Sequence, residues 1–260
     1  MRLTVDGKET FAATGGREFD PALPAVVFLH GAGMDHSVWA LLARAFAHRG
    51  FSVLAPDLPG HGRSAGAALA SIAALADWTA ALIEAAGLPA ARLIGHSMGA
   101  LTALETAARD PQKITGLGLI AAAGAVPVSA DLLAAAKAGD HAAIDMVAIW
   151  GNGYRATLGG CEAPGLWMLG GAERLLERAR PGVLFADLSA CNDYQDGLAA
   201  AEKVTVPTVL ILGSRDLMIP AKAGKALAAA IPGARLTVLE GAGHLLMSER
   251  PNEVLAALRS

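Results

Sequence analysis

The stretch Gly95-His96-Ser97-Met98-Gly99 lies between a short apolar run that ends at Ile94 and a run of helix formers that begins at Ala100. As an isolated pattern, G-x-S-x-G often marks only a surface turn, since glycine and serine are frequent turn residues. Between a strand and a helix, it is typical of a nucleophile elbow, a sharp turn that holds a serine hydroxyl at its tip. The two glycines permit the turn and let the helix approach the strand closely. The stretch therefore predicts Ser97 as an activated nucleophile.

Short apolar runs alternate with longer helical patterns on both sides of this stretch. Such alternation is typical of an α/β fold with a mostly parallel sheet and helices on both faces. At the N-terminus, an Asp6-Gly7 turn joins two further runs and predicts an antiparallel hairpin at the edge of the sheet. The expected strands are 2–5, 10–13, 26–29, 52–55, 92–94, 117–120, 208–212 and 236–239, and the expected helices are 37–49, 70–86, 98–109, 222–230 and 250–259.

The stretch from 126 to 189 breaks this alternation, because it contains no convincing strand. Residues 131–150 and 166–178 have helical patterns, and five glycines and Pro164 lie between them. A chain of 260 residues is long enough for one large domain with an insertion. We therefore expect a core domain made of 1–125 and 190–260, with a helical insertion over 126–189.

A serine nucleophile needs a base to take its proton and an acid to orient that base. His244 follows the last expected strand in a glycine-rich turn, and Asp216 follows the strand before it. Alone, Asp216 could be a turn or cap residue and His244 an ordinary loop residue. Together they follow successive parallel strands, whose carboxyl ends meet at one edge of the sheet. We expect a catalytic triad of Ser97, Asp216 and His244, in the chain order typical of this architecture.

The oxyanion formed during attack needs preorganised N–H donors. One expected donor is the backbone N–H of Met98, at the start of the helix after the nucleophile. The other should come from the loop after strand 26–29, where we choose Ala32, with Gly33 as the second choice. His30 in this loop and Asp57 after the next strand are interpreted as structural residues.

Several classes of function lack support in the sequence. The net charge of −3 provides no electrostatic footprint for nucleic acid. No signal peptide and no apolar run of about 18 residues is present, so we expect a cytoplasmic protein without a membrane segment. The histidines suggest no metal site, and the glycine-rich loops match no phosphate-binding pattern, so no cofactor is expected. Cys161 and Cys191 are too few for a disulfide scaffold.

Five segments together resemble the α/β-hydrolase superfamily. They are His30-Gly31-Ala32-Gly33, Asp57-Leu58-Pro59-Gly60-His61-Gly62-Arg63-Ser64, the elbow stretch, Gly213-Ser214-Arg215-Asp216 and Gly241-Ala242-Gly243-His244. Within the superfamily, the chain looks most like the capped serine esterases and enol-lactonases. The resemblance implies an α/β-hydrolase fold whose helical cap falls on 126–189.

The expected function is hydrolysis of a small carboxylic ester or lactone through an acyl-enzyme intermediate. Meta-cleavage C–C hydrolases share the triad, but they typically carry a tryptophan after the catalytic histidine, where this chain has Leu245. Perhydrolases, thioesterases and acyltransferases use the same machinery and remain open. A small-molecule receptor without turnover is a further hypothesis. In the insertion, Trp150 and Trp167 are the expected substrate-binding side chains, although cap packing is the alternative role for each.

Overall fold

The computed structural model describes residues 1–160 and 165–259. Within these ranges, eight strands form one sheet in the order β1-β2-β4-β3-β5-β6-β7-β8. Strands β3 to β8 are parallel, whereas β2 runs antiparallel to both of its neighbours, β1 and β4. The strands are β1 (Arg2–Val5), β2 (Lys8–Ala13), β3 (Ala25–Leu29), β4 (Ser52–Pro56), β5 (Ala91–His96), β6 (Ile114–Ile120), β7 (Thr208–Gly213) and β8 (Arg235–Leu239).

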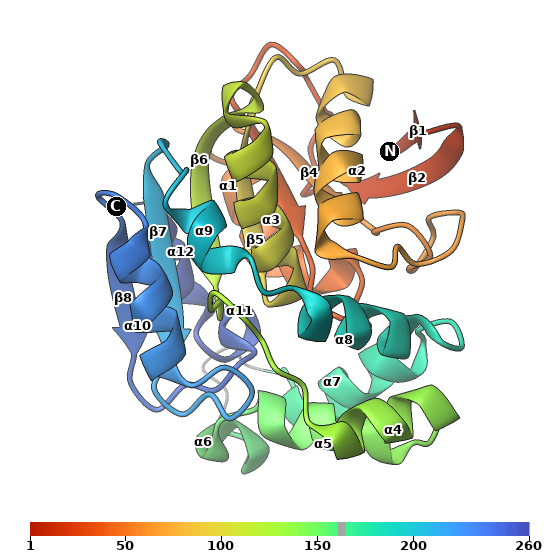
Figure 1. The fold of residues 1–260 in the computed structure, drawn as a ribbon. Helices are drawn as coiled ribbons and strands as arrows, with labels where there is room; N and C mark the ends of the chain where they lie inside the picture. The colour runs from red at the N-terminus through yellow and green to blue at the C-terminus, as the bar shows by residue number, and fades with distance from the viewer. Residues whose placement is uncertain (161–164, 260) are drawn as a thin grey trace.

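Helices cover this sheet on both faces and at one end (Figure 1). A 3₁₀ turn, η1 (His36–Trp39), precedes α1 (Ala40–Ala47), and a second, η2 (Pro111–Lys113), precedes β6. The α-helices after α1 are α2 (Ile72–Ala85), α3 (Met98–Arg109), α4 (Ala130–Ala138), α5 (Ala142–Gly151), α6 (Tyr154–Thr157), α7 (Met168–Glu177), α8 (Val183–Asp193), α9 (Gly197–Ala201), α10 (Ala221–Ala230), α11 (Leu246–Glu249) and α12 (Pro251–Arg259). The fold class predicted from the sequence is confirmed.

Alternate side chains of the central strands enter two separate apolar layers. Val27 and Leu29 of β3 pack in the layer that contains α2 and α3, whereas Val26 and Phe28 pack in the layer that contains α1 and α12. This follows from the period of two in a strand, and it explains why these strands are apolar throughout. The parallel strands therefore end together at one edge, with their last residues held between two layers of helices.

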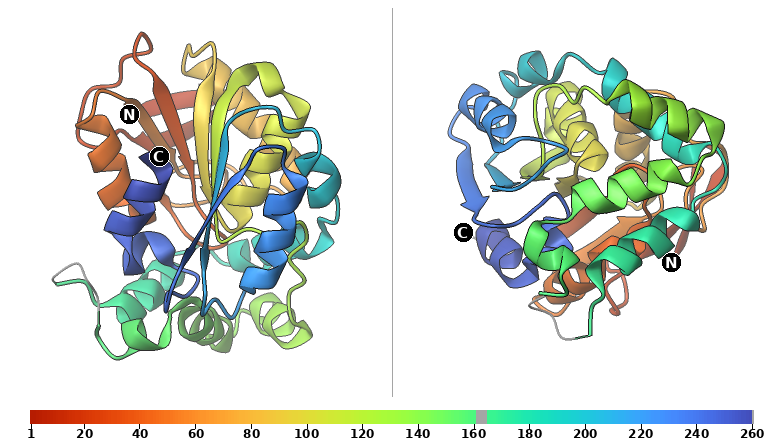
Figure 2. Two further views of the ribbon diagram at one scale, coloured as in Figure 1. Left: turned by 90° about the vertical axis from the view of Figure 1, so that its left-hand side faces the viewer. Right: turned by 90° about the horizontal axis from the view of Figure 1, so that it is seen from below.

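Helices α4 to α8 lie across that edge, at the bottom of Figure 1 and toward the viewer in the right-hand view of Figure 2. The single helix expected over 131–150 is two helices, α4 and α5. Gly139, with φ +69°, ends α4 in the left-handed conformation that favours glycine. The expected boundary after residue 189 falls inside α8, which ends at Asp193.

Cys191 is buried in α8, and Cys161 lies outside the described residues. No helix in the described ranges combines the length and apolar character that crossing a membrane requires.

Candidate active site

Ser97 occupies the turn between β5 and α3. Its backbone has φ +52° and ψ −117°, a strained conformation for a residue with a side chain. The Ser97 N–H donates to the Ile120 carbonyl of β6 at 3.0 Å, which ties the turn to the sheet. A Cβ atom at Gly99 would overlap the Leu29 carbonyl, so this position requires glycine for the close approach of α3 to β3. The local geometry is that of a nucleophile elbow.

Asp216 and His244 come together beyond the ends of β7 and β8. His244 Nδ1–H donates to Asp216 Oδ2 at 2.8 Å, and both residues are buried. The other carboxylate oxygen, Oδ1, accepts the N–H groups of Met218 and Ile219 at 2.8 Å each. These bonds hold the carboxylate in place, and the carboxylate sets the imidazole tautomer that leaves Nε2 as the acceptor nitrogen.

The elbow and the histidine loop meet through His96, the residue before Ser97. His96 Nε2–H donates to the His244 carbonyl at 3.0 Å, and the two rings lie 4.7 Å apart. Burial, together with the nearby His244, holds the pKa of His96 well below its usual value, so the ring is neutral. In the described chain, Ser97 Oγ forms no hydrogen bond with His244, and the elbow and the histidine loop are joined through His96.

The loop after β3 is held by a second buried histidine. His30 Nε2 accepts the Leu58 N–H at 3.1 Å, and its Nδ1–H donates to the Gly31 carbonyl at 2.9 Å. Burial, with the charge of His61 next in size, lowers the pKa of His30 to about 4. A neutral ring bonded to main chain at both nitrogens acts as a brace for the loop.

In the loop after β3, the backbone N–H groups of Gly33 and Ala32 differ in whether they have a hydrogen-bond acceptor. Gly33 N–H donates to Asp187 Oδ2 of α8 at 2.8 Å. Among the described residues, the Ala32 N–H has no hydrogen-bond acceptor, and Ala32 is half-buried at the surface of the loop. The glycine donor is therefore already used, and the alanine donor is available.

Asp187 also binds His61, forming a buried pair that sequence reasoning missed. His61 Nε2–H donates to Asp187 Oδ2 at 2.8 Å, and Nδ1–H donates to the Pro59 carbonyl at 3.0 Å. Because both ring nitrogens face acceptors, the ring is suited to carry a proton on each. Burial lowers the pKa of His61, but the hydrogen bond and charge of Asp187 outweigh burial and raise it above its usual value. Helix α8 thus reaches the loop after β3 through one carboxylate.

Asp57 is enclosed by hydrogen bonds. Its Oδ1 accepts the backbone N–H and the Nδ1–H of His36 at 2.8 and 2.7 Å, and its Oδ2 accepts the Arg63 N–H at 2.8 Å. Asp35, His36 and Asp57 form the one group of potential metal ligands found in the described chain. Asp35 pairs with Arg178, so the members of this group already have protein partners.

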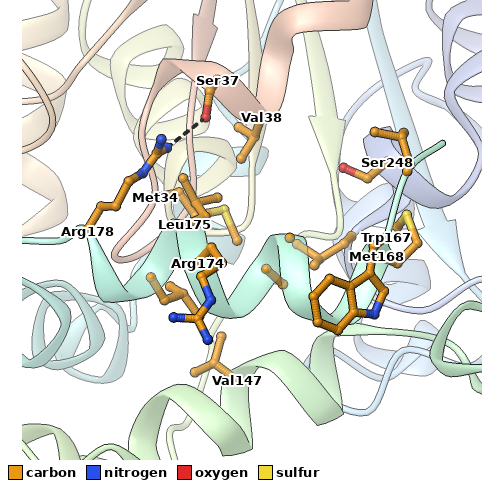
Figure 3. A pocket seen from close by; sticks show the side chains of 15 residues that line it. Met34, Ser37, Val38, Val147, Trp167, Met168, Arg174, Leu175, Arg178 and Ser248 are labelled. Atoms are coloured by element: carbon orange, nitrogen blue, oxygen red, sulfur yellow. Dashed lines mark hydrogen bonds between the residues drawn. The ribbon is translucent and has the colours of Figure 1, made fainter.

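A cavity of about 240 Å³ lies between the cap and the core. Trp167 and Met168 line it from the cap, whereas Val38 and Ser248 face it from the core (Figure 3). Met34 and Leu245, the residues that follow Gly33 and His244 in the chain, also line it, whereas Ser97 and His244 are not among its lining residues. Trp150 is not among the lining residues. It packs against the apolar cluster of the cap, so Trp167 alone of the two expected substrate-binding side chains lines this cavity.

Comparison with known proteins agrees with this geometry. Residues 26–258 match the model of the alpha/beta hydrolase family. The chain is 32% identical to pimeloyl-[acyl-carrier protein] methyl ester esterase of Aromatoleum aromaticum, over 88% of this chain and 94% of the relative. It is 33% identical to the protein of that name from Chromobacterium violaceum, over 90% of this chain and 92% of the relative.

Among solved structures, the enol-lactonase from Burkholderia xenovorans LB400 superposes with a TM-score of 0.89 at 25% identity, covering 100% of this chain and 98% of the other. The similarity to esterases and to an enol-lactonase confirms the resemblance expected from the motifs. The family match spans the elbow, the residues after β7 and β8, and the helices laid across the end of the sheet. The chain is therefore a hydrolase of the α/β fold and belongs to the alpha/beta hydrolase family.

Proposed function

We propose that the protein hydrolyses a small carboxylic ester or lactone, with Ser97 as the nucleophile. The observation that carries this proposal is the buried Asp216–His244 pair, which is joined through His96 to the strained turn that presents Ser97. Strain of this kind persists only where the surroundings enforce it, and it is common at catalytic turns. The relatives' names, an esterase of a methyl ester and an enol-lactonase, support the same class of carbonyl chemistry.

His244 Nε2 takes the Ser97 proton as Oγ attacks the substrate carbonyl, and the tetrahedral intermediate collapses to an acyl-enzyme. The imidazolium gives its proton to the leaving alcohol. The neutral imidazole then takes a proton from the water that attacks the acyl-enzyme, and it returns this proton to Ser97 Oγ as the acid leaves. Asp216 stays ionised and stabilises the imidazolium. The hydrogen bond between Ser97 and His244 forms when substrate is bound, since such contacts are often long in free enzymes.

The oxyanion is bound by the N–H groups of Ala32 and Met98. Ala32 is preferred over Gly33 because Asp187 already takes the Gly33 donor. Met98 begins α3, so its N–H lies at a helix N-terminus, where the helix dipole favours negative charge. The apolar part of the substrate occupies the cavity beside Met34 and Leu245, with Trp167 covering its outer side.

The test is labelling with a fluorophosphonate, in which an activated serine oxygen displaces fluoride from phosphorus. We expect the label on the peptide that contains Ser97, lost in Ser97→Ala and strongly slowed in His244→Gln. Hydrolysis of short esters and lactones should fall by at least about a thousandfold in Ser97→Ala, because triad residues act as a unit. Near-normal turnover in that variant would refute the mechanism. Ligand-induced stabilisation without product release would favour the receptor alternative.

A further inference from the structure

Glu249 is a buried carboxylate that the proposed mechanism does not use. It lies in α11 and is only 6% exposed. Its two oxygens accept the Gly243 N–H at 3.1 Å each, and the Gly153 N–H at 3.3 and 3.2 Å. Burial raises the pKa of Glu249, although these hydrogen bonds act to lower it. Burying a carboxylate is unfavourable, so a carboxylate held between two main-chain donors indicates a specific role for Glu249.

The two donors come from different parts of the molecule. Gly243 directly precedes His244, whereas Gly153 belongs to the cap and is the N-cap residue of α6. The two glycines are in close contact, because a Cβ at Gly243 would overlap the Gly153 nitrogen and lie 2.8 Å from Glu249 Oε1. The carboxylate thus joins cap and core at a place where the backbones of Gly153 and Gly243 are already in contact.

The cap also binds the histidine loop directly beside this contact. The Gly151 carbonyl accepts the N–H groups of His244 and Leu245, at 3.0 and 2.9 Å. From the opposite side, His96 holds the carbonyl of His244. Successive peptide units around His244 are therefore held by partners outside their own loop, and two of these partners, Gly151 and Gly153, come from the cap.

We propose that Glu249 is a positioning residue, which sets the place of His244 relative to Ser97 by clamping Gly153 of the cap to Gly243 of the core. The inference rests on the proposed function, because it requires His244 to be the base. Misplacing a catalytic group by about 1 Å can cost on the order of 100-fold in rate. The cap then belongs to the catalytic framework, in addition to covering the cavity.

The experiment compares Glu249→Gln and Glu249→Ala with the wild type and with Glu253→Gln. Glu253 is a matched control, a half-exposed glutamate of α12 that pairs with Arg250 at 3.1 Å. For each protein, kcat and KM are measured with p-nitrophenyl butyrate, together with the rate of fluorophosphonate labelling and the thermal unfolding midpoint. We expect kcat and the labelling rate to fall about 10-fold in Glu249→Gln and about 100-fold in Glu249→Ala, with KM nearly unchanged. The order follows because glutamine keeps one acceptor oxygen and alanine keeps none.

A purely structural role predicts a different result, namely a lower unfolding midpoint with wild-type kcat and labelling rate in the folded protein. That result would overturn the inference. Wild-type labelling that does not depend on Ser97 would instead refute the proposed function, so the two failures are distinguishable. If Glu249→Ala does not fold, the NMR signal of the His244 Nδ1 proton decides. We expect the chemical shift of this proton to change in Glu249→Gln and to stay at the wild-type value in Glu253→Gln. An unchanged chemical shift in both variants would contradict the proposed role.

Discussion

Helices α4 to α8, the expected cap, meet two loops of the core at two junctions that are built from different parts. At the histidine loop, the carboxylate of Glu249 belongs to the core and is held by backbone N–H groups of Gly153 and Gly243. At the loop after β3, the carboxylate of Asp187 belongs to the cap and is shared between the Gly33 N–H and the His61 ring. Each junction therefore joins a glycine of a core loop, Gly243 or Gly33, to the cap.

The difference between the junctions lies in how the buried charge is compensated. Asp187 faces a histidine whose two ring nitrogens both have acceptors, so the charge has an opposite partner. Among the described residues, Glu249 has only main-chain donors for its hydrogen bonds. Burial raises its pKa most, and the nearby charges of Arg250 and Asp216 act on that pKa in opposite directions, Arg250 lowering it and Asp216 raising it. We infer that the Asp187 junction depends on the His61 side chain, whereas the Glu249 junction depends on the positions of the Gly153 and Gly243 backbones.

Breaking the Asp187 junction should have the largest effect on stability. Asp187→Ala leaves a buried His61 ring without its acceptor and the Gly33 N–H unpaired, and removing one partner of a buried pair typically costs about 3–5 kcal/mol. The free energy of unfolding in urea measures this loss. Asp193→Ala, on an exposed position of the same helix, is the control and should change little. If Asp187→Ala lowers the free energy of unfolding no more than Asp193→Ala does, Asp187 does not stabilise the contact between cap and core.

Asp187→Asn sharpens the same comparison by keeping an oxygen for Gly33 while removing the charge. We expect a smaller loss of stability than in Asp187→Ala, because one acceptor survives. We also expect kcat to be closer to the wild type than in Asp187→Ala, because the Gly33 bond orients the loop that presents Ala32. Equal kcat in the two variants would show that this bond does not orient the loop.

The Glu249 junction should respond to pH on the acid side of neutrality. The pKa of Glu249 is raised in the folded state, so the folded protein holds this proton to higher pH than the unfolded chain does. The contribution to the free energy of unfolding is therefore present at low pH and is lost as pH rises through the raised pKa. Urea unfolding from acid to neutral pH should show that the stability gap between wild type and Glu249→Gln narrows as pH rises. A gap that widens would contradict the assigned sign.

The Asp187 junction should respond at higher pH, with the smallest effect of the series. The pKa of His61 is raised above its ordinary value of 6.5, so its contribution is complete below that value and is lost as pH rises through the folded pKa. His61→Gln should lack this decline in the free energy of unfolding. His48→Gln, at an exposed position, should retain it. Parallel pH profiles for His61→Gln and the wild type would show that the ring is not protonated in the fold.

Local patterns were sufficient to predict the sheet and the elbow. The parallel strands from β3 to β8 were all expected, although β6 begins at Ile114, three residues before the predicted start. The period of two and the turn glycines are local properties, so they can be detected without knowledge of distant contacts. The split between α4 and α5 was missed because helix formers lie on both sides of Gly139. Gly139 ends α4 through its left-handed conformation, which the pattern of helix formers does not show.

The sequence by itself determined the fold class and the candidates Ser97, Asp216 and His244, since each follows a strand, and strand ends in a parallel sheet share an edge. Only the tertiary structure decided which polar groups meet across the cap. Asp187 lies 154 residues from Gly33, and Glu249 lies 96 residues from Gly153, so no local period relates them. Their roles come from burial, because a carboxylate acts as a clamp only where the fold removes water and supplies the donors.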